Sequence, residues 1–322
     1  MNNGLTTAVI VSYGDRSNYF TKVLLALNES DKIDKIIFVN NAISKESRIS
    51  LESLKIEKLK ILNQGKNTGS AKGYKDGILK ALNINSDFIW LLDDDNLPEN
   101  QALDVLYQNW QLLSKQYKKD IALLSYRPDR NIFKKAIELN KPNLMLGPNN
   151  SFLGINFFHK LKGLVTKSKK NKLTKTDVGK VDVAPYGGLF FRSSLIETIG
   201  LPDEDFFLYG DDYDFSYRIT QKGDGIFLIL KSVVNDLEKS FHLKGKKVNI
   251  ISNRFINTNS KIKIFYSVRN GINFELKFIT NKLVYYSNAL CHILGTLLVF
   301  ILRPKHLWKF KYYIKGIKSS KC

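Results

Sequence analysis

Short apolar runs that alternate with stretches of helical spacing restrict the fold of this chain more than any other feature. The runs TAVIVSY, KIIFVN and FIWLL have strand length and occupy residues 7–13, 35–40 and 88–92, and a shorter run occupies residues 59–63. Residues 18–27 and 68–83 space their apolar side chains as helices do. Continuous apolar strands separated by helices are typical of parallel strands covered on both faces. We therefore predict an α/β domain with a mostly parallel central sheet and flanking helices, which binds ligands at the carboxyl ends of its strands.

The charge of the chain predicts a polyanionic partner. The 322 residues are 43% hydrophobic and 25% charged, which is ordinary for a folded protein, but the formal net charge is +20. Such a surface attracts nucleic acid, anionic lipid or phosphorylated substrates, and charge alone does not choose among them.

Cysteine usage and the start of the chain predict a cytoplasmic protein. The two cysteines, Cys291 and Cys322, have no paired or metal-type spacing, which favours a reducing compartment. The first residues lack a basic segment followed by a long apolar run, so we expect no secretory signal.

Three adjacent carboxylates follow the strand FIWLL directly. In an extended segment Asp93 and Asp95 face one side while Asp94 points elsewhere. Paired carboxylates suit a hard cation such as Mn²⁺ or Mg²⁺, which also binds phosphates. The alternative interpretation is an acidic turn that caps the next helix.

A second acidic cluster follows an aromatic stretch in FFLYGDDYDFSYR. Here Asp211, Asp212 and Asp214 stand at the start of a predicted helix, where they could simply stabilise its N-terminus. A carboxylate beside apolar rings gains basicity and can accept a proton from an alcohol. A metal site followed by a separate base, on an α/β scaffold, is the apparatus for displacing a nucleoside diphosphate from a sugar with inversion.

The C-terminal region differs in character from the rest. From residue 261 onward there are 12 Lys/Arg and one Glu, and residues 283–302 are uncharged. Asn288, His292 and Thr296 recur at helical spacing, so a helix in the membrane interface, or packed on the domain, fits better than a membrane span. We predict a catalytic domain over residues 1–275 and a basic amphipathic helical region over residues 276–322 that associates with a membrane surface; the alternative is a core helix with a solvated basic end.

Six segments resemble the inverting glycosyltransferase family 2, which has the nucleotide-binding GT-A fold. They are VIVSYGDR, FVNNAIS, NQGKNTGSAKGYKDGI, WLLDDDNLPE, YGGLFFR and FLYGDDYDFSYRI. The later FYSVRNGI, with Tyr266, Arg269 and Asn270, is similar to a feature of the bacterial galactofuranosyl- and rhamnosyltransferases of O-antigen, lipopolysaccharide or capsule polysaccharide synthesis. The resemblance implies a Rossmann-like nucleotide-binding half, an acceptor half and a helical C-terminal annex.

The resemblance also implies a role for each matching residue. Donor-binding positions are Ser12, Tyr13, Asp15, Asn40, Asn41, Asn67, Gly69, Lys72, Asp93 and Asp94. Acceptor-binding positions are Tyr186, Gly187, Gly188 and Leu189. Asp93 and Asp95 match the residues that hold Mn²⁺ or Mg²⁺, Asp212 matches the catalytic base, and Asp211 is its reserve.

Several of these positions have simpler interpretations. Gly69 and Gly73 are equally compatible with close helix packing, Gly187 and Gly188 with a turn, and Lys72 with a solvated helix lysine.

One position departs from the family pattern. Many relatives have a histidine metal ligand after the last core strand, whereas VVNDLEKS has Asn235 there, and the nearest histidine is His242. Either residue is a candidate for completing the metal site.

The sequence thus predicts an inverting, divalent-metal-dependent hexosyltransferase, peripheral on the inner face of the cell membrane. The preferred reaction moves galactofuranose from UDP-galactofuranose to a lipid-linked glycan, and the alternative donor is dTDP-rhamnose. A basic nucleic-acid- or lipid-binding protein without catalysis is the alternative of a different class. Because no RNP, KH, zinc-finger or helix-turn-helix signature occurs, we expect no nucleic-acid partner.

Overall fold

The computed structural model describes residues 4–118, 120–159, 161, 173–238, 255 and 257–321. The chain divides into two compact units. Unit 1 comprises residues 1–145, 173–207 and 211–240, and unit 2 comprises residues 146–172, 208–210 and 241–322. The domain boundary that we predict at residues 275/276 falls inside unit 2.

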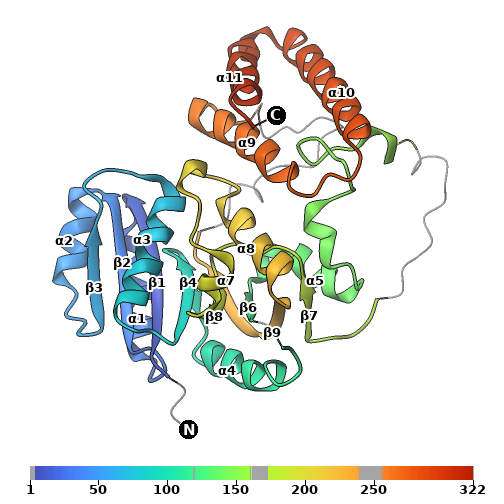
Figure 1. Ribbon diagram of the computed structural model, residues 1–322. Coiled ribbons are helices and arrows are strands. Elements are labelled where there is room, and N and C mark those ends of the chain that lie inside the picture. Colours follow the sequence, from blue (N-terminus) through green and yellow to red (C-terminus); the bar gives the residue numbers. More distant parts are fainter. Residues whose placement is uncertain are drawn as a thin grey trace. The chain divides into compact units, whose positions relative to one another are not determined.

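Unit 1 alternates strands and helices (Figure 1). Its strands are β1 (Thr6–Gly14), β2 (Lys35–Ile43), β3 (Leu59–Asn63), β4 (Phe88–Asp93), β5 (Asn96–Pro98), β6 (Ile121–Tyr126), β7 (Val178–Val181), β8 (Leu189–Arg192) and β9 (Gly225–Asp236). Its α-helices are α1 (Ser17–Glu29), α2 (Lys45–Ser53), α3 (Gly69–Asn83), α4 (Ala102–Leu113), α5 (Asn131–Glu138), α7 (Leu195–Ile199) and α8 (Asp211–Lys222). Short 3₁₀ helices are η1 (Pro128–Arg130), η2 (Pro142–Leu146) and η3 (Glu204–Phe206). The four strands and two helices predicted in the first third of the chain are confirmed to within three residues.

The strands form one sheet in the order β3-β2-β1-β4-β8-β6-β9-β5, with β7 paired to β9. The first four strands of that order are parallel, whereas β8 runs antiparallel to both β4 and β6. The part of the sheet formed by β1 to β4 is therefore parallel as predicted, and the remainder is mixed. Val11 pairs with Asp93 and Ser12 with Asn40, so the polar residues that end β1, β2 and β4 lie at one edge.

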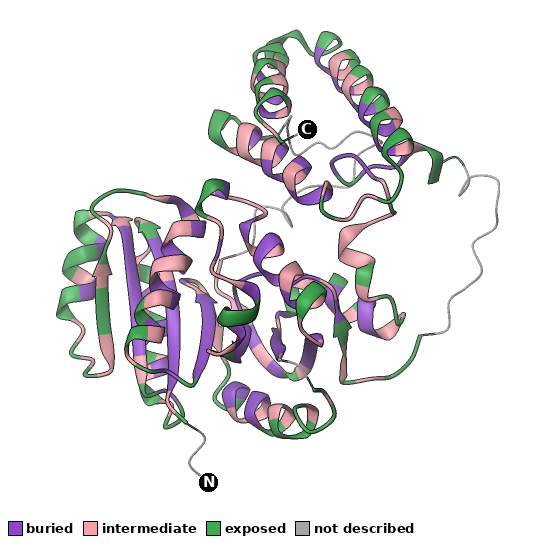
Figure 2. Cartoon of the chain, viewed as in Figure 1, coloured by how far each residue is buried: buried purple, intermediate pink, exposed green. Residues whose placement is uncertain are grey.

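Apolar side chains pack on both faces of this sheet, as the alternation along β1 illustrates. Val9 lies in a core with α3, α5, α7 and α8, whereas Ala8 and Ile10 lie in another with α1, α2 and α4. All three are fully buried, and Figure 2 shows the central strands buried along most of their length. Burial of a Val or Ile side chain contributes about 1.5–3 kcal/mol, so this alternation fixes the register of the strand.

Unit 2 is helical and has a core of its own. Its elements are α9 (Lys261–Glu275), α10 (Lys282–Ile301), η4 (Pro304–His306) and α11 (Leu307–Lys318). The core side chains include Ile264 and Val268 of α9, Tyr285 and Phe300 of α10, and Tyr313 of α11. Among the described residues, α10 is the helix that is long and apolar enough, by length and composition, to cross a membrane.

Candidate active site

The adjacent carboxylates at the end of β4 have different partners. Asp94 turns toward β1, where Ser12 Oγ donates to it at 2.5 Å and Arg16 Nη2 lies 2.8 Å away. Asp93 lies 3.0 Å from the hydroxyl of Tyr74 and accepts from Arg127 Nη1 at 2.9 Å. Asp94 therefore points away from the side that Asp93 faces, as strand alternation predicts.

Asp93 and Asp95 differ in how their charge is balanced. The charge of Arg127 contributes most to lowering the pKa of Asp93, against the opposing effect of burial. Burial and the charges of Asp93 and Asp94 raise the pKa of Asp95 to about 7. Its ion-pair contact is long, with Oδ2 3.7 Å from Arg16 Nη2. Asp95 is thus the carboxylate of this cluster whose charge is least neutralised by the protein.

The second acidic cluster opens α8. Ser70 Oγ donates to Asp211 Oδ2 at 2.7 Å, and Asp211 is buried. Asp212 is only partly buried, and its Oδ1 accepts from the backbone N–H of Tyr213 at 2.9 Å. Burial raises the pKa of both carboxyls, and the charge of Asp212 raises that of Asp211 further. Asp212 is the more accessible of two carboxylates with increased basicity.

The two acidic clusters lie near enough within unit 1 for the charge of one to affect the ionisation of the other. The charge of Asp93 raises the pKa of both Asp211 and Asp212. Between them, the rings of Tyr74 and Tyr186 lie 4.0 Å apart. Burial and the charges of Asp211 and Asp212 raise the pKa of Tyr186 well above its ordinary value. A cation bound at Asp93 would therefore act on the same region as the carboxylates of α8.

The segment before β8 lies directly against the first cluster. A Cβ added at Gly187 would collide with Asn96 and Arg127 and come within 2.6 Å of Asp93 Oδ2. Gly188 has a φ of +95°, which favours glycine. The two glycines therefore form a turn and also let the backbone pass close to the acidic cluster.

The other two predicted acceptor residues are less accessible. Leu189 is fully buried in the sheet core and Tyr186 is 4% exposed. The hydroxyl of Tyr186 is buried and has no hydrogen-bond partner within the part of the chain that the structure describes.

The amides that follow β2 are engaged in holding the loop between β3 and α3. Asn40 Nδ2 donates to Asn63 Oδ1 at 2.7 Å. Asn41 accepts from the backbone N–H of Thr68 at 2.8 Å and donates to the carbonyl of Gly69 at 3.0 Å. These buried side chains shape the loop, so a direct contact with a nucleotide base would compete with existing bonds.

The predicted donor residues of that loop and helix also have partners in the protein. Asn67 Oδ1 accepts from the backbone N–H of Gly69 at 2.9 Å, and a Cβ at Gly69 would collide with the carbonyl of Phe207. Lys72 pairs with Asp76 at 3.1 Å, which supports its interpretation as a helix-surface lysine. In the same helix, a Cβ at Gly73 would come within 2.6 Å of a methyl of Val11 on β1, so Gly73 serves packing.

The end of β1 offers one exposed side chain. Tyr13 is 58% exposed, whereas Ser12 is buried against Asp94. Asp15 Oδ1 accepts from Ser47 Oγ at 3.0 Å. Of these three residues, Tyr13 is the one with a large surface available for stacking on a base.

Comparison with known proteins finds a matching family model, two relatives and a similar solved structure. Residues 7–152 match the family model described as Glycosyl transferase family 2. Over this segment the chain is similar to glycosyl transferase family 2. The matched segment contains the acidic cluster of β4 and the predicted donor residues, whereas α8 lies beyond it.

Two curated relatives are similar to the chain over part of their length. Galactofuranosyltransferase GlfT1 of Mycolicibacterium smegmatis is 25% identical over 222 residues, which is 67% of this chain and 65% of that protein. GlfT1 of Mycobacterium tuberculosis is 25% identical over 167 residues, which is 50% of this chain and 46% of that protein. The chain thus spans less than two thirds of the length of these relatives.

A solved structure of the same architecture confirms the fold. The crystal structure of GalNAc-T7 with UDP, GalNAc and Mn²⁺ aligns with a TM-score of 0.55 and 12% identity, over 84% of this chain and 48% of that one. The chain therefore has the predicted GT-A fold.

The acidic cluster at the end of β4 fits a divalent cation. Asp93 and Asp95 have hard carboxylate oxygens, and burial with the neighbouring charges of Asp93 and Asp94 raises the pKa of Asp95, so a bound cation would relieve this repulsion. Among the described residues, no group of three or more His, Cys, Asp and Glu side chains is arranged to hold a metal. The protein would then contribute two carboxylates, and a substrate phosphate would contribute further oxygens. Such a combination is typical of Mg²⁺ and Mn²⁺ sites in phosphate chemistry.

Two residues of this site were missed by sequence reasoning. Arg127 follows β6, is 5% exposed, and donates Nε to Asp236 at 2.7 Å while its Nη1 binds Asp93. The signal in the sequence that could have found Arg127 was its position directly after the buried strand β6. Asp236 stands beside Asn235 in β9, and strand alternation separates the two: Asn235 donates to Glu99, whereas Asp236 points to Arg127. The predicted ligand His242 lies outside the described residues.

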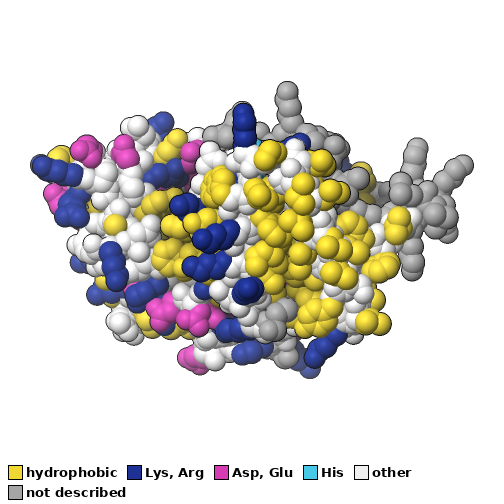
Figure 3. Space-filling view, turned by 90° about the horizontal axis from the view of Figure 1, so that it is seen from above, with side chains coloured by type: hydrophobic (Ala, Val, Ile, Leu, Met, Phe, Trp, Pro, Cys, Tyr) yellow, Lys and Arg dark blue, Asp and Glu magenta, His cyan; other side chains and the backbone are white. Residues whose placement is uncertain are grey.

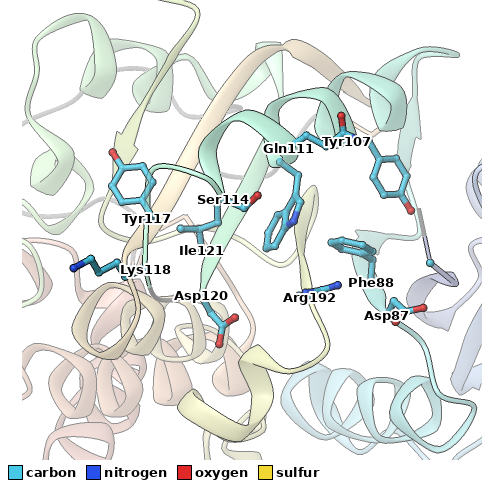
Figure 4. Close-up of a pocket in the computed structure, with 12 residues that line it drawn as sticks. Asp87, Phe88, Tyr107, Gln111, Ser114, Tyr117, Lys118, Asp120, Ile121 and Arg192 are labelled. Carbon is cyan, nitrogen blue, oxygen red and sulfur yellow. The ribbon is translucent and has the colours of Figure 1, made fainter. Parts of the chain in front are cut away.

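A pocket of about 610 Å³ lies at the opposite edge of the sheet (Figure 4). It is lined by Asp87 and Phe88 at the start of β4, by Arg192 at the end of β8, and by residues of α4 and the segment that follows it. Because α/β sheets bind their ligands at the carboxyl ends of parallel strands, we assign the reaction site to the acidic edge instead.

Proposed function

We propose that the chain is an inverting, divalent-metal-dependent hexosyltransferase that uses a nucleotide-sugar donor. The observation that carries this proposal is the shared electrostatic site of Asp93, Asp211 and Asp212, in which the charge at the end of β4 raises the pKa of both carboxyls of α8. Displacement of a nucleoside diphosphate requires a place for the negative leaving group and a separate base for the incoming alcohol. The two clusters are suited to these two tasks.

In the proposed reaction Asp212 accepts the proton of the acceptor hydroxyl. The acceptor oxygen forms a bond to the anomeric carbon from the face opposite the donor, and the bond from that carbon to the diphosphate oxygen breaks. The nucleoside diphosphate leaves with the electron pair, so the configuration inverts. Mn²⁺ or Mg²⁺ held by Asp93 and Asp95 would offset the charge on the leaving group. Arg127 fixes the orientation of Asp93 through its hydrogen bond.

The preferred donor is UDP-galactofuranose. Support for this choice comes from the two relatives named galactofuranosyltransferase, which are 25% identical to this chain. dTDP-rhamnose is the alternative, because the matching motifs are shared by rhamnosyltransferases.

The proposed acceptor is a lipid-linked glycan at the cytoplasmic membrane surface, to which the protein binds peripherally. The net charge of +20 supports this part of the proposal, because both a lipid diphosphate and an anionic membrane attract a basic protein.

A donor panel tests the proposal directly. Purified protein with Mn²⁺ or Mg²⁺ is incubated with UDP-galactofuranose, dTDP-rhamnose and UDP-hexopyranoses, and released nucleoside diphosphate is measured. We expect release from one donor above all others, largely abolished by chelation and restored by Mn²⁺. Absence of release from every donor, with and without a polyprenyl-diphosphate glycan, would contradict the proposal.

A further inference from the structure

A surface helix of a soluble protein buries its apolar side and exposes its polar side, whereas α10 does the opposite. Its polar stripe, formed by Asn288, His292 and Thr296, is buried, with exposures of 2% or less. Its apolar stripe is exposed and includes Leu283, Tyr286, Leu290, Leu294, Leu298 and Ile301. These positions recur every three to four residues, so they form a continuous line along one side of the helix.

The buried polar stripe is tied to unit 2 by specific hydrogen bonds. Asn288 accepts from the backbone N–H of Phe157 and donates to the carbonyl of Asn150, both at 2.9 Å. His292 Nδ1 lies 2.7 Å from the hydroxyl of Tyr313 on α11. A helix that crossed a bilayer alone would break these bonds and place the polar stripe in hydrocarbon, which is costly.

The surface around the apolar stripe is basic. Lys282 precedes it and Arg303 and Lys305 follow it, all exposed, and the segment from residue 261 onward has 12 Lys/Arg against one Glu. Figure 3 shows the hydrophobic side chains gathered in one patch with Lys and Arg beside it. Two copies of such a surface would repel each other, whereas an anionic bilayer is attracted to it.

We propose that the outer face of α10 is a monotopic membrane-binding surface that lies parallel to an anionic bilayer, with its leucines at the boundary of headgroups and acyl chains. The polar stripe then faces the protein, the leucines leave water, and the flanking cations meet lipid phosphates. Tyr286, an exposed aromatic side chain in this stripe, suits the interfacial region. This inference rests on the peripheral membrane binding of the proposed function. Because lipid binding requires no sugar transfer, its failure would contradict that binding and leave the catalytic proposal untouched.

Vesicle co-sedimentation of the full chain tests the surface. We expect binding to phosphatidylglycerol–phosphatidylcholine vesicles, weaker binding to phosphatidylcholine alone, and a loss of about tenfold or more for the double variant Leu290→Glu/Leu294→Glu. Both leucines are more than half exposed, so the variant should fold. Leu112→Glu is the matched control, because Leu112 is 62% exposed on α4 of unit 1. Binding of the double variant at the wild-type level would overturn the proposal.

The native Cys291 reports the depth of the helix. It is exposed and stands near the middle of α10, so in Cys322→Ser protein it is the sole thiol and can be labelled with an environment-sensitive fluorophore. A helix lying in the interface predicts stronger quenching by a nitroxide near the headgroup than by one at the end of the acyl chain. The reverse order would indicate a span and would refute a monotopic arrangement.

Sedimentation velocity without lipid tests whether a second copy of the chain, instead of a membrane, covers the outer face of α10. We expect a species of the monomer mass, 36.9 kDa. A dimer that Leu290→Glu/Leu294→Glu dissociates, together with no vesicle binding by the wild type, would assign this face to self-association.

Discussion

Asp212 must be ionised to accept a proton, and its surroundings oppose ionisation. Burial and the charge of Asp93 raise its pKa, while the hydrogen bond from the backbone N–H of Tyr213 and the charge of Arg130 lower it only in part. A base with a raised pKa stays protonated, and so inactive, up to a higher pH than an ordinary aspartate.

The rate should therefore depend on pH. We expect kcat to rise as the pH rises through a midpoint well above about 3.9, the ordinary value for aspartate, since activity appears only when the base loses its proton. Steady-state kinetics across the pH range measures this, with circular dichroism at each pH as the control for folding. A profile that stays flat down to about pH 4 would exclude a base of raised pKa.

Gly187 is the second residue on which the geometry of the site depends. We expect Gly187→Ala to lower kcat/KM by about a hundredfold, because the new methyl group would displace Arg127 and Asp93. Enzyme kinetics measures the loss, and an unchanged melting temperature would locate it in the site. Wild-type activity in this variant would show that the position of Asp93 is unimportant.

Sequence reasoning at the residue scale succeeded where local geometry decides. Strand alternation alone separates Asp94 from Asp93, and the contacts agree. It failed for Arg127 and Asp236, because their pairing joins β6 to β9 across about 110 residues and depends on the order of strands in the sheet. The metal ligand after the last strand stays open, since His242 lies outside the described residues.

At the scale of elements, periodicity predicted which segments are strands and helices but could not predict which side of α10 faces the protein. The polar stripe was compatible with a helix in the membrane interface and with a helix packed on the domain. The contacts of Asn288 and His292 with the rest of unit 2 show that this stripe is the packed side. Close packing was the alternative interpretation of Gly73 in α3, and the structure supports it, because a Cβ there would come within 2.6 Å of Val11 on β1. Gly77, where a Cβ would collide with Val9 on the same strand, was not singled out from the sequence.

The packing of α3 gives a stability prediction. We expect Gly77→Val to lower the free energy of unfolding by about 1–3 kcal/mol, because the added side chain overpacks the interface with β1. Urea denaturation measures the change. Lys80→Val is the matched control, since it places the same side chain at an exposed position of the same helix. Equal stabilities of the two variants would show that α3 has room to move from the sheet.

At the scale of the whole molecule, the predicted donor residues all lie in unit 1 and the proposed membrane surface lies in unit 2. Removal of residues 281–322 should therefore release the protein from membranes and leave the affinity for UDP unchanged. Because α10 and α11 supply Tyr285, Phe300 and Tyr313 to the core of unit 2, the truncated chain should also expose apolar surface and bind 8-anilinonaphthalene-1-sulfonate. Vesicle sedimentation, UDP titration and dye fluorescence measure the three effects. Complete sedimentation of the truncated protein with lipid would contradict the role of this region.

The central claim is that one carboxylate cluster binds the cation while a separate carboxylate accepts the proton. The most direct test measures UDP affinity in Mn²⁺ and turnover in the same preparations of Asp95→Asn and Asp212→Asn, with Asp31→Asn as an exposed control. We predict that Asp95→Asn weakens Mn²⁺-dependent UDP binding, whereas Asp212→Asn binds UDP as the wild type does and turns over about 10²–10⁴-fold more slowly. Turnover at the wild-type rate by Asp212→Asn would contradict the assignment.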